Sequence, residues 1–311
     1  MAPNTPKNST APCGIIVVDK PPGITSHDVV YRIRRIFQTK KVGHTGTLDP
    51  LATGVLVLCL GHATRIVEFL TSDSKEYIAG VRFGITTDSQ DITGQVVETR
   101  DASSLMEAQI ESVLDLFRGP TKQTPPMVSA IHHEGKRLYE LAREGKEVDR
   151  VARPITFYEV TLLDFAPGDT PEATFRVRCS AGAYIRTLAH DIGQALSVGA
   201  TMISLRRTAA GQFILSQAAT LESLEELREA GHERDQLISI PTALANWPVV
   251  TLTDEEEALI QRGMKIPAPE TECPSDRYLL VNSRGEESAL ANCVGSDLAP
   301  FKVFPIAGGA N

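Results

Sequence analysis

A loop rich in glycine carries the carboxylate best placed to do chemistry. Residues 43–54 read GHTGTLDPLATG, with three glycines and one proline. Glycine permits backbone conformations closed to other residues and proline fixes one dihedral, so this composition specifies a constrained, non-repetitive backbone. Asp49 lies between Leu48 and Pro50, just before an apolar run. Apolar neighbours partly desolvate a carboxylate, and a nearby cation can keep it ionised and nucleophilic. Asp49 is therefore a candidate catalytic carboxylate.

Other interpretations of this loop have to be weighed. A glycine-rich loop can bind phosphate, but this one lacks the G-K-[ST] ending of a P-loop. It also lacks the G-x-S-x-G pattern of a nucleophile elbow. A structural role stays open, because an aspartate before a proline commonly caps a turn by accepting hydrogen bonds from backbone N–H groups. The loop residues by themselves do not decide between a cap and a catalyst.

Ordered elements are predicted on both sides of the loop. GIIVVDK at 14–20 is a short apolar run that ends at a Pro-Pro-Gly turn, which indicates a strand. Thr25 or Ser26 can then cap a helix whose apolar residues recur at helical spacing as far as Phe37. VLVLCL at 55–60 has the pattern of a buried strand. The loop is therefore expected to run between two packed elements.

The rest of the chain mixes helices and strands without regular alternation. Strands are predicted at 77–84, 92–98, 155–164 and 173–180, a strand and turn at 200–213, and helices at 104–117, 184–196, 221–230 and 254–262. The stretch from 124 to 153 is polar and charged; it has room for a short helix but does not resemble core. Because strand–helix–strand units do not repeat, we expect an α+β fold with a mainly antiparallel central sheet flanked by helices and loops.

Charge is distributed unevenly along the chain. The net charge of −8 argues against a nucleic-acid partner. Residues 220–257, however, hold ten acidic and two basic residues, so the rest of the chain is neutral. Within that rest, residues 31–41 carry five positive charges and no negative one, and residues 118–153 hold eight basic and five acidic residues. RNA could bind these two stretches. The alternative is that each basic stretch is only a solvated face.

Composition excludes several other classes of protein. The chain of 311 residues is 42% hydrophobic and 23% charged, which suits one large domain and a small one. Its five cysteines show no C-x-x-C pair and no metal-ligand spacing, so we expect reduced thiols in a cytoplasmic protein. Residues 1–12 are polar and proline-rich and are predicted to form a disordered tail. No apolar run reaches membrane-spanning length, so no membrane partner is expected.

Two motifs near the N-terminus carry a family resemblance. VVDKPPGITS (17–26) and KVGHTGTLDPLATGVL (41–56) resemble the two N-terminal signatures of the TruB family of pseudouridine synthases, LDKPxGxTS and VGHTGTLDPxATGVL. Further matching segments follow in the order of the family: SKEYIAGVRFG (74–84), TPPMVSAIHHEGKRLYELAREG (124–145), CSAGAYIRTLAHDIG (179–193) and LRRTAAGQF (205–213). The resemblance therefore extends over most of the chain as far as residue 213.

The resemblance implies a fold, a division into domains and an activity. The fold is that of the pseudouridine synthases, with a small C-terminal PUA-like β domain. The implied parts are the tail at 1–12, a catalytic domain at 13–246 with a tRNA-gripping insertion at about 124–153, and a PUA-like RNA-binding domain at 247–311. The implied reaction isomerises uridine to pseudouridine at position 55 in the T arm of tRNA, after the base is flipped out.

The same resemblance implies the partners. The T-arm stem-loop of tRNA would be bound by a monomer. No cofactor and no metal are expected, because the glycosidic bond is broken and re-formed without redox change or group transfer.

Site residues are implied where this sequence matches the family motifs. Asp49 is similar to the catalytic aspartate shared by all pseudouridine synthases. Tyr77 matches the tyrosine that stacks on the flipped uracil. Tyr184 and Arg186 are two residues apart, so in an extended segment both face one side, where Tyr184 lines the pocket and Arg186 pairs with Asp49. A cation at the start of a helix is unfavourable near the positive end of the dipole, which favours a specific partner for Arg186.

The remaining implied residues support or contact the substrate. Leu205 matches the position whose backbone contacts the uracil edge, and His44 matches the histidine that enters the space left by flipped bases. Lys20 and Pro21 resemble the family residues that support the pocket. Ala183 departs from the family, which usually has threonine there, so a local hydrogen bond is in question.

Two rival functions are considered. A guide-RNA-dependent pseudouridine synthase would share the same core, but the 124–153 segment resembles the insertion of the stand-alone enzymes. A non-catalytic RNA-binding or tRNA-folding protein would not need Asp49 together with Tyr77 and Arg186. For the stand-alone enzyme we expect the acidic 220–257 stretch to face away from RNA. The residues expected to bind RNA are Arg32, Arg34, Arg35, Lys40, Lys41, Lys122, Lys136, Arg137, Arg143 and Lys146.

Overall fold

The structure is a computed structural model. It describes residues 11–71, 74–127, 129, 132–133, 135–137, 141, 144–146, 148–269 and 275–305, with the backbone alone at 132, 133, 136 and 137. Arg143 therefore lies outside the described residues, as do nearly all of the predicted tail and most of the short helix predicted within 124–153.

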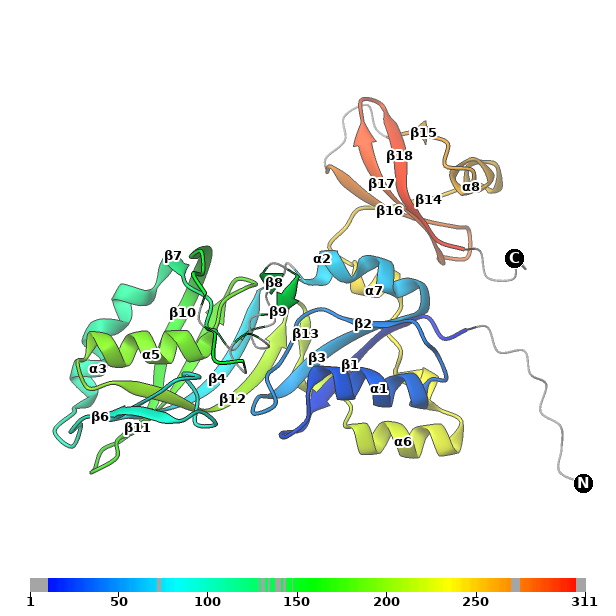
Figure 1. Cartoon of the computed structure of the whole chain (residues 1–311). Coiled ribbons are helices and arrows are strands. Elements are labelled where there is room, and N and C mark those ends of the chain that lie inside the picture. The colour runs from blue at the N-terminus through cyan, green and yellow to red at the C-terminus, as the bar shows by residue number, and fades with distance from the viewer. Residues whose placement is uncertain are drawn as a thin grey trace, which may run out of the picture.

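One large sheet forms the body of the molecule (Figure 1). Its strands are, in spatial order, β1 (Gly14–Lys20), β3 (Thr53–Leu60), β12 (Ala200–Ala210), β4 (Lys75–Phe83), β11 (Glu172–Cys179), β10 (Arg153–Ala166) and β7 (Gly119–Gln123), with β2 (Val42–His44) beside β3 and β13 (Phe213–Ile214) beside β12. Every pairing is antiparallel except that of β12 with β3, which is parallel. The predicted α+β class with a mainly antiparallel sheet is confirmed.

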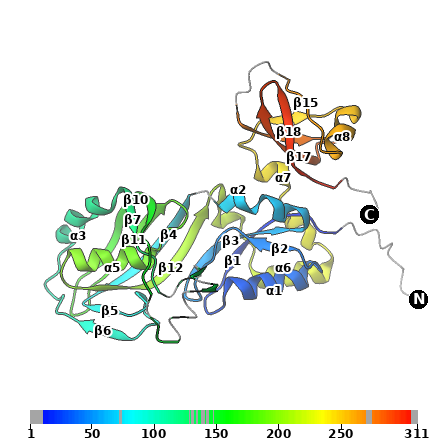
Figure 2. The same cartoon turned by 45° about the horizontal axis from the view of Figure 1, so that its top comes forward.

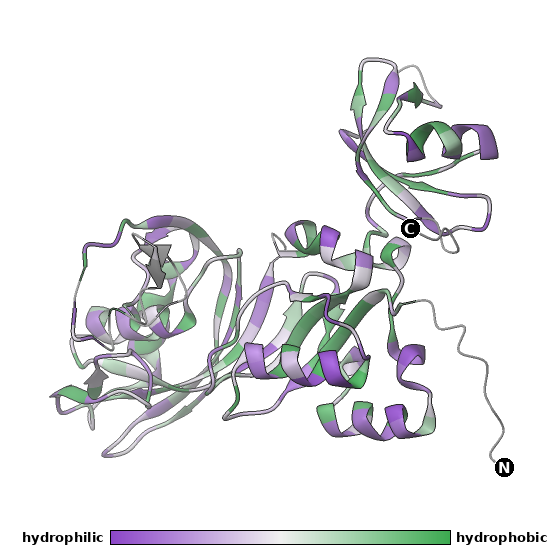
Figure 3. Ribbon diagram, turned by 45° about the vertical axis from the view of Figure 1, so that its right-hand side comes forward, coloured by the Kyte–Doolittle hydropathy of each residue, from purple (hydrophilic) through white to green (hydrophobic). Residues whose placement is uncertain are grey.

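Helices cover the two faces of the β1–β3 half of the sheet. Ile16 and Val18 belong to a core shared with α1, whereas Ile15 and Val17 face the opposite core, as expected from alternation along a strand. The elements around the sheet are α1 (Ser26–Ile36), η1 (Gly61–Ile66), α2 (Val67–Thr71), η3 (Leu215–Gln217), α6 (Leu221–Ala230), η4 (Glu233–Gln236) and α7 (Ile240–Ala243). In Figure 3 the strands of this half are largely hydrophobic and α6 is largely hydrophilic.

The other half of the sheet packs against α3 (Glu107–Leu114) and α5 (Ile185–Ala195) (Figure 1). The predicted helix at 104–117 is shorter than expected and ends in the 3-10 turn η2 (Asp115–Phe117). The predicted strand at 92–98 is instead the second arm of a hairpin of β5 (Ile85–Thr87) and β6 (Val96–Thr99). Two short strands, β8 (His132–His133) and β9 (Lys136–Arg137), pair within the 124–153 segment.

A second, smaller sheet follows residue 247 and stands beside the part built on the large sheet (Figure 2). Its strands are β14 (Val249–Thr251), β16 (Arg277–Val281), β17 (Glu287–Val294), β18 (Asp297–Val303) and β15 (Ile266–Pro267), accompanied by α8 (Asp254–Gln261). This C-terminal module has a core of its own around Ile260 and Leu280. It also places Leu279 and Phe304 in a core shared with the large sheet, so the two parts pack together.

Two predictions about the surface and the thiols are corrected. Arg32 of α1 forms ion pairs with Glu222 at 3.4 Å and Glu225 at 3.0 Å, because α1 packs against α6. The acidic stretch therefore does not face away from this arginine. Cys293 is disulfide-bonded, so the expectation of reduced thiols is wrong for Cys293. Spacing along the chain could not show this bond, because distant cysteines can meet in a fold.

No helix in the described part of the chain is long and apolar enough to cross a membrane.

Candidate active site

Lys20 binds the turn that carries Asp49. Its side chain is fully buried at the end of β1. The ammonium donates hydrogen bonds to the carbonyls of Pro21 at 3.0 Å, Pro50 at 3.3 Å and Ala52 at 2.7 Å. Burial lowers the pKa of Lys20 to about 8, and the Asp49 carboxylate opposes this fall. Three hydrogen bonds therefore join Lys20 to the turn, one of them to Pro21 itself, and its role as pocket support remains a prediction.

Arg207 binds the same loop from the strand β12. Its guanidinium is 2% exposed and donates to the carbonyls of Val55 at 2.6 Å and Gly46 at 3.1 Å. Among the described residues no carboxylate lies within ion-pair distance of Arg207. Gly54 makes the close approach possible: it has φ of +97°, and a Cβ there would lie 2.2 Å from the carbonyl oxygen of Arg207. On the opposite side, the buried Ser26 hydroxyl accepts from the Leu48 N–H at 2.8 Å.

Asp49 faces a buried arginine. The Arg186 guanidinium lies 3.1 Å from the Asp49 carboxylate and 3.5 Å from that of Asp91. Arg186 and Asp91 have side chains 4% and 6% exposed, whereas 36% of the Asp49 side chain is exposed. Burial raises the pKa of Asp49 above its usual range, and Arg186 opposes that rise. The predicted pair of Asp49 and Arg186 is present, and the one carboxylate of the three-residue group that remains accessible is Asp49.

Asp91 comes from the loop of the β5–β6 hairpin. Its Oδ1 atom accepts hydrogen bonds from the Ser89 hydroxyl and from the Thr93 N–H, both at 2.9 Å. The neighbouring Gln90 accepts from the Thr187 hydroxyl of α5 at 2.8 Å. The Asp91 bonds lie within the hairpin loop, and the Gln90–Thr187 bond joins that loop to the first turn of α5, which carries Arg186.

Tyr184 lies just before α5, next to Arg186. It is the N-cap residue with extended backbone, φ −109° and ψ 110°. The Arg186 guanidinium carbon lies 5.9 Å from the centre of the Tyr184 ring. The prediction that both side chains face one side is therefore supported by their contact. Burial raises the pKa of Tyr184, so its phenol stays protonated at neutral pH.

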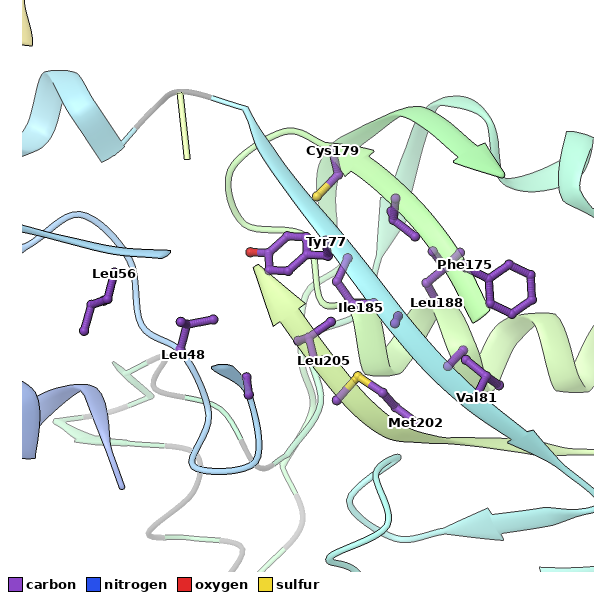
Figure 4. Close-up of a cluster of buried hydrophobic side chains, with 14 of the residues drawn as sticks. Leu48, Leu56, Tyr77, Val81, Phe175, Cys179, Ile185, Leu188, Met202 and Leu205 are labelled. Atoms are coloured by element: carbon purple, nitrogen blue, oxygen red, sulfur yellow. The ribbon is translucent and has the colours of Figure 1, made fainter. Parts of the chain in front are cut away.

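Tyr77 is the third residue of β4, which lies between β12 and β11. Its register partners are Arg207 on β12 and Val177 on β11, and its side chain is 8% exposed. In Figure 4 the ring lies beside Ile185 and Leu205, and the hydroxyl points to the side of the loop that carries Leu48. Burial raises the pKa of Tyr77, and the Arg207 guanidinium opposes that rise. The apolar side chains of Ile185 and Leu205 and the flat ring of Tyr77 thus lie beside the loop that carries Asp49.

His44, Leu205 and Ala183 also lie around this site. His44 ends β2, and its Nδ1 accepts from the Gly46 N–H at 3.3 Å. Burial lowers the pKa of His44, so the ring is neutral at physiological pH. The carbonyl of Leu205 accepts from the Thr53 hydroxyl at 3.5 Å. Ala183 is half-buried directly before Tyr184. Their roles toward a substrate remain predictions.

Comparison with known proteins shows which family this chain belongs to. The model described as TruB family pseudouridylate synthase (N terminal domain) matches residues 34–185, and the one described as tRNA pseudouridylate synthase B C-terminal domain matches residues 186–244. The tRNA pseudouridine synthase B of Symbiobacterium thermophilum is 48% identical over 251 residues, covering 81% of this chain and 82% of the relative. The chain belongs to the TruB family of pseudouridylate synthases.

Other comparisons agree with TruB membership. The tRNA pseudouridine synthase B of Saccharophagus degradans is 45% identical over 258 residues, covering 81% of this chain and 82% of that protein. Among solved structures, a chain of an H/ACA RNP bound to a substrate RNA containing 2′-deoxyuridine has a TM-score of 0.71 and 28% identity, covering 95% of this chain and 86% of its own. A chain of a Cbf5–Nop10–Gar1 complex has a TM-score of 0.70 and 30% identity, covering 94% and 85%.

Three residues of this TruB site were missed by sequence reasoning. Asp91 is one acid in a polar loop, and nothing in its surroundings distinguishes it. Arg207 had a usable signal, because it shares a strand face with Leu205 two residues earlier. Gln123, which binds the backbone of Tyr184, had none. In the part of the chain that the structure describes, no three His, Cys, Asp or Glu side chains form a group that could hold a metal ion.

Proposed function

We propose that this TruB family member converts uridine 55 to pseudouridine in the T arm of tRNA. The observation that carries the proposal is the Asp49 carboxylate, accessible and 3.1 Å from the buried Arg186, on a loop bound by Lys20 and Arg207. A carboxylate held by a cation in a low-dielectric site stays ionised and has a defined direction of attack. Relatives that share 45–48% identity bear the name tRNA pseudouridine synthase B.

The isomerisation conserves every atom of the nucleotide. The bond between N1 of the uracil and C1′ of the ribose breaks, the base turns, and C5 bonds to C1′. The proton on C5 is lost and N1 gains one. Ionised Asp49 would attack C1′, attack C6, or remove the proton from C2′, and each path needs it close to the sugar. Because a uridine in a folded arm is unreachable, the base must be extruded, and Tyr77 would stack on it.

The finer assignments rest on the family resemblance together with the layout of the chain. The catalytic domain would be residues 13–246, with the tRNA-gripping insertion at about 124–153. The second sheet, within 247–311, would be the PUA-like RNA-binding domain. We also propose a cytoplasmic monomer that works without metal or cofactor. Substrate roles for Tyr184, Leu205 and His44 belong to the same proposal.

A guide-RNA-dependent synthase is the second candidate. In its favour, the chain matches the Cbf5 chain of a Cbf5–Nop10–Gar1 complex over 94% of its length. Identity to that chain is 30%, however, compared with 48% for the relative named tRNA pseudouridine synthase B. The stand-alone reaction is therefore favoured. A purely RNA-binding role would leave the Asp49–Arg186 pair without a use.

The test is a direct assay of modification. Pure protein is incubated with an unmodified tRNA transcript in EDTA and without guide RNA, and the positions of pseudouridine in the tRNA are mapped. We expect one modified position, uridine 55, and the same result with an isolated T-arm hairpin. A transcript with cytidine at that position is the control and should gain no pseudouridine. Activity that appeared only after a guide RNA was added would reject the stand-alone function.

A further inference from the structure

A buried glutamine joins the sheet to the helix that carries Arg186. Gln123 is the last residue of β7 and is 5% exposed. Its amide nitrogen donates to the Tyr184 carbonyl at 3.0 Å, and its amide oxygen accepts from the Tyr184 N–H at 2.7 Å. Both polar atoms of one amide group therefore bind the backbone of one residue, in the pattern that a neighbouring strand would form.

Tyr184 is the point where extended chain becomes helix. Its carbonyl also accepts the first intrahelical hydrogen bond, from the Leu188 N–H at 3.1 Å. The described start of α5 has no side-chain cap bond and no acidic residue in its first turn, and Arg186 in that turn is unfavourable to the helix dipole. The two bonds from Gln123 supply the restraint that a capping residue would normally give.

Arg186 is two residues beyond this restraint. Rotation about the dihedrals of Tyr184 would swing the first turn of α5 and change the 3.1 Å contact between Arg186 and Asp49. It would also move the Tyr184 ring, which lies 5.9 Å from the guanidinium carbon. Holding one residue in φ and ψ therefore sets the position of both side chains.

We propose that Gln123 is a positioning residue that holds Tyr184, and through it Arg186, in place against Asp49. The inference rests on the proposed function, since its effect is measured on that reaction. Gln123 is also the residue at which the chain leaves the sheet, and Arg153, its register partner, is where it returns. The residue at the start of the 124–153 segment is thus joined to Tyr184 of the site by two hydrogen bonds.

The competing explanation is that Gln123 only satisfies buried backbone groups. Loss of its side chain would then lower stability without a specific effect on catalysis. A matched control exists in the C-terminal module, where Gln261 donates to the Ser288 hydroxyl at 3.2 Å and the Phe304 carbonyl at 3.1 Å. Gln123→Met and Gln261→Met each remove two side-chain hydrogen bonds, and only the first faces the active site.

The experiment compares single-turnover rates and T-arm affinity of the two variants with those of the wild type. We expect Gln123→Met to lower the rate by about tenfold to a hundredfold, the scale of small misplacements of catalytic groups, with Kd nearly unchanged. Gln261→Met should leave both unchanged. Arg186 opposes the raised pKa of Asp49, so its displacement in Gln123→Met should move the acid limb of the pH–rate profile to higher pH.

A double variant tests the route. If Gln123 acts through Arg186, Gln123→Met should add little to the defect of Arg186→Lys, whereas independent effects would multiply. Should Gln123→Met fail to fold, Gln123→Glu keeps the shape and the acceptor and is expected to behave alike. A wild-type rate in folded Gln123 variants, or fully multiplicative effects, overturns the positioning role and leaves the proposed function intact. An inactive wild type overturns both.

Discussion

Lys20→Met should change how the stability of the protein depends on pH. The Lys20 ammonium is fully buried, and burial lowers its pKa from an ordinary 10.5 to about 8. Between these two values the unfolded chain binds more protons than the folded protein. The free energy of unfolding of the wild type therefore rises with pH across this window, because the cost of burying the charge disappears.

The size of the effect follows from the two pKa values. They differ by about 2.5, and at 1.36 kcal/mol per pH unit the buried charge costs about 3 kcal/mol below pH 8. About 2 kcal/mol of this is regained between pH 7 and pH 9.5. Methionine has no charge to bury, so the variant lacks this gain. It also leaves the carbonyls of Pro21, Pro50 and Ala52 without the ammonium donor, which lowers its stability at every pH.

Urea unfolding of the wild type and of Lys20→Met at pH 7, 8.5 and 9.5 measures the difference. The unfolding free energy of the wild type minus that of Lys20→Met should rise by about 2 kcal/mol from the lowest to the highest pH. Other titrating groups are common to both proteins and cancel. Lys40→Met, at an exposed lysine, is the matched control and should follow the wild type. A gap that stays constant with pH would show that the Lys20 charge is not buried as the structure describes.

Three further outcomes are expected. Asp49→Asn should abolish turnover, a loss of many powers of ten, with tRNA binding nearly intact; residual activity within about tenfold of the wild type would reject its catalytic role. Arg186→Met should move the acid limb of the pH–rate profile to higher pH, because Arg186 opposes the raised pKa of Asp49, and an unmoved limb would contradict the pairing. The double variant Lys40→Gln, Lys41→Gln should reduce the slope of log K for tRNA binding against log salt by about 0.7–0.9 per lost phosphate contact. Arg32→Gln should change this slope little, because the Arg32 guanidinium is paired with acids of α6. Equal slopes for the two variants would show that Lys40 and Lys41 do not lie on the RNA-binding face.

Local patterns in the chain were sufficient for most of the elements. Strand β1 and helix α6 have the predicted bounds of 14–20 and 221–230, because an apolar run between turn residues and a capped amphipathic stretch are signals contained within one segment. The helix predicted at 104–117 ends early at Leu114, in a 3-10 turn. Only the second strand of the hairpin at 85–99 was expected, at 92–98; its first strand, Ile85–Thr87, has three residues and was not predicted.

The loop that carries Asp49 was also found from the sequence, because a short run of glycines with that aspartate carries its own motif. Its surroundings were found only in part: Lys20 was expected there from the family motif, and Arg207 was not. Charged side chains usually lie at the surface, yet Lys20 and Arg207 are both buried, since carbonyls of the loop and of β3 accept hydrogen bonds from them.

What the sequence determined by itself is most of the elements, the loop and the family motifs, since each depends on residues close together in the chain. What the tertiary structure decided is which charged groups meet. The pair of Arg186 and Asp49 was expected from the family motifs, but the approach of Asp91 to the same arginine and the ion pair of Arg32 with Glu222 were not. Periodicity reports only whether a residue points inward or outward. The partner of a charge depends on how distant elements pack, which depends on the whole sheet at once.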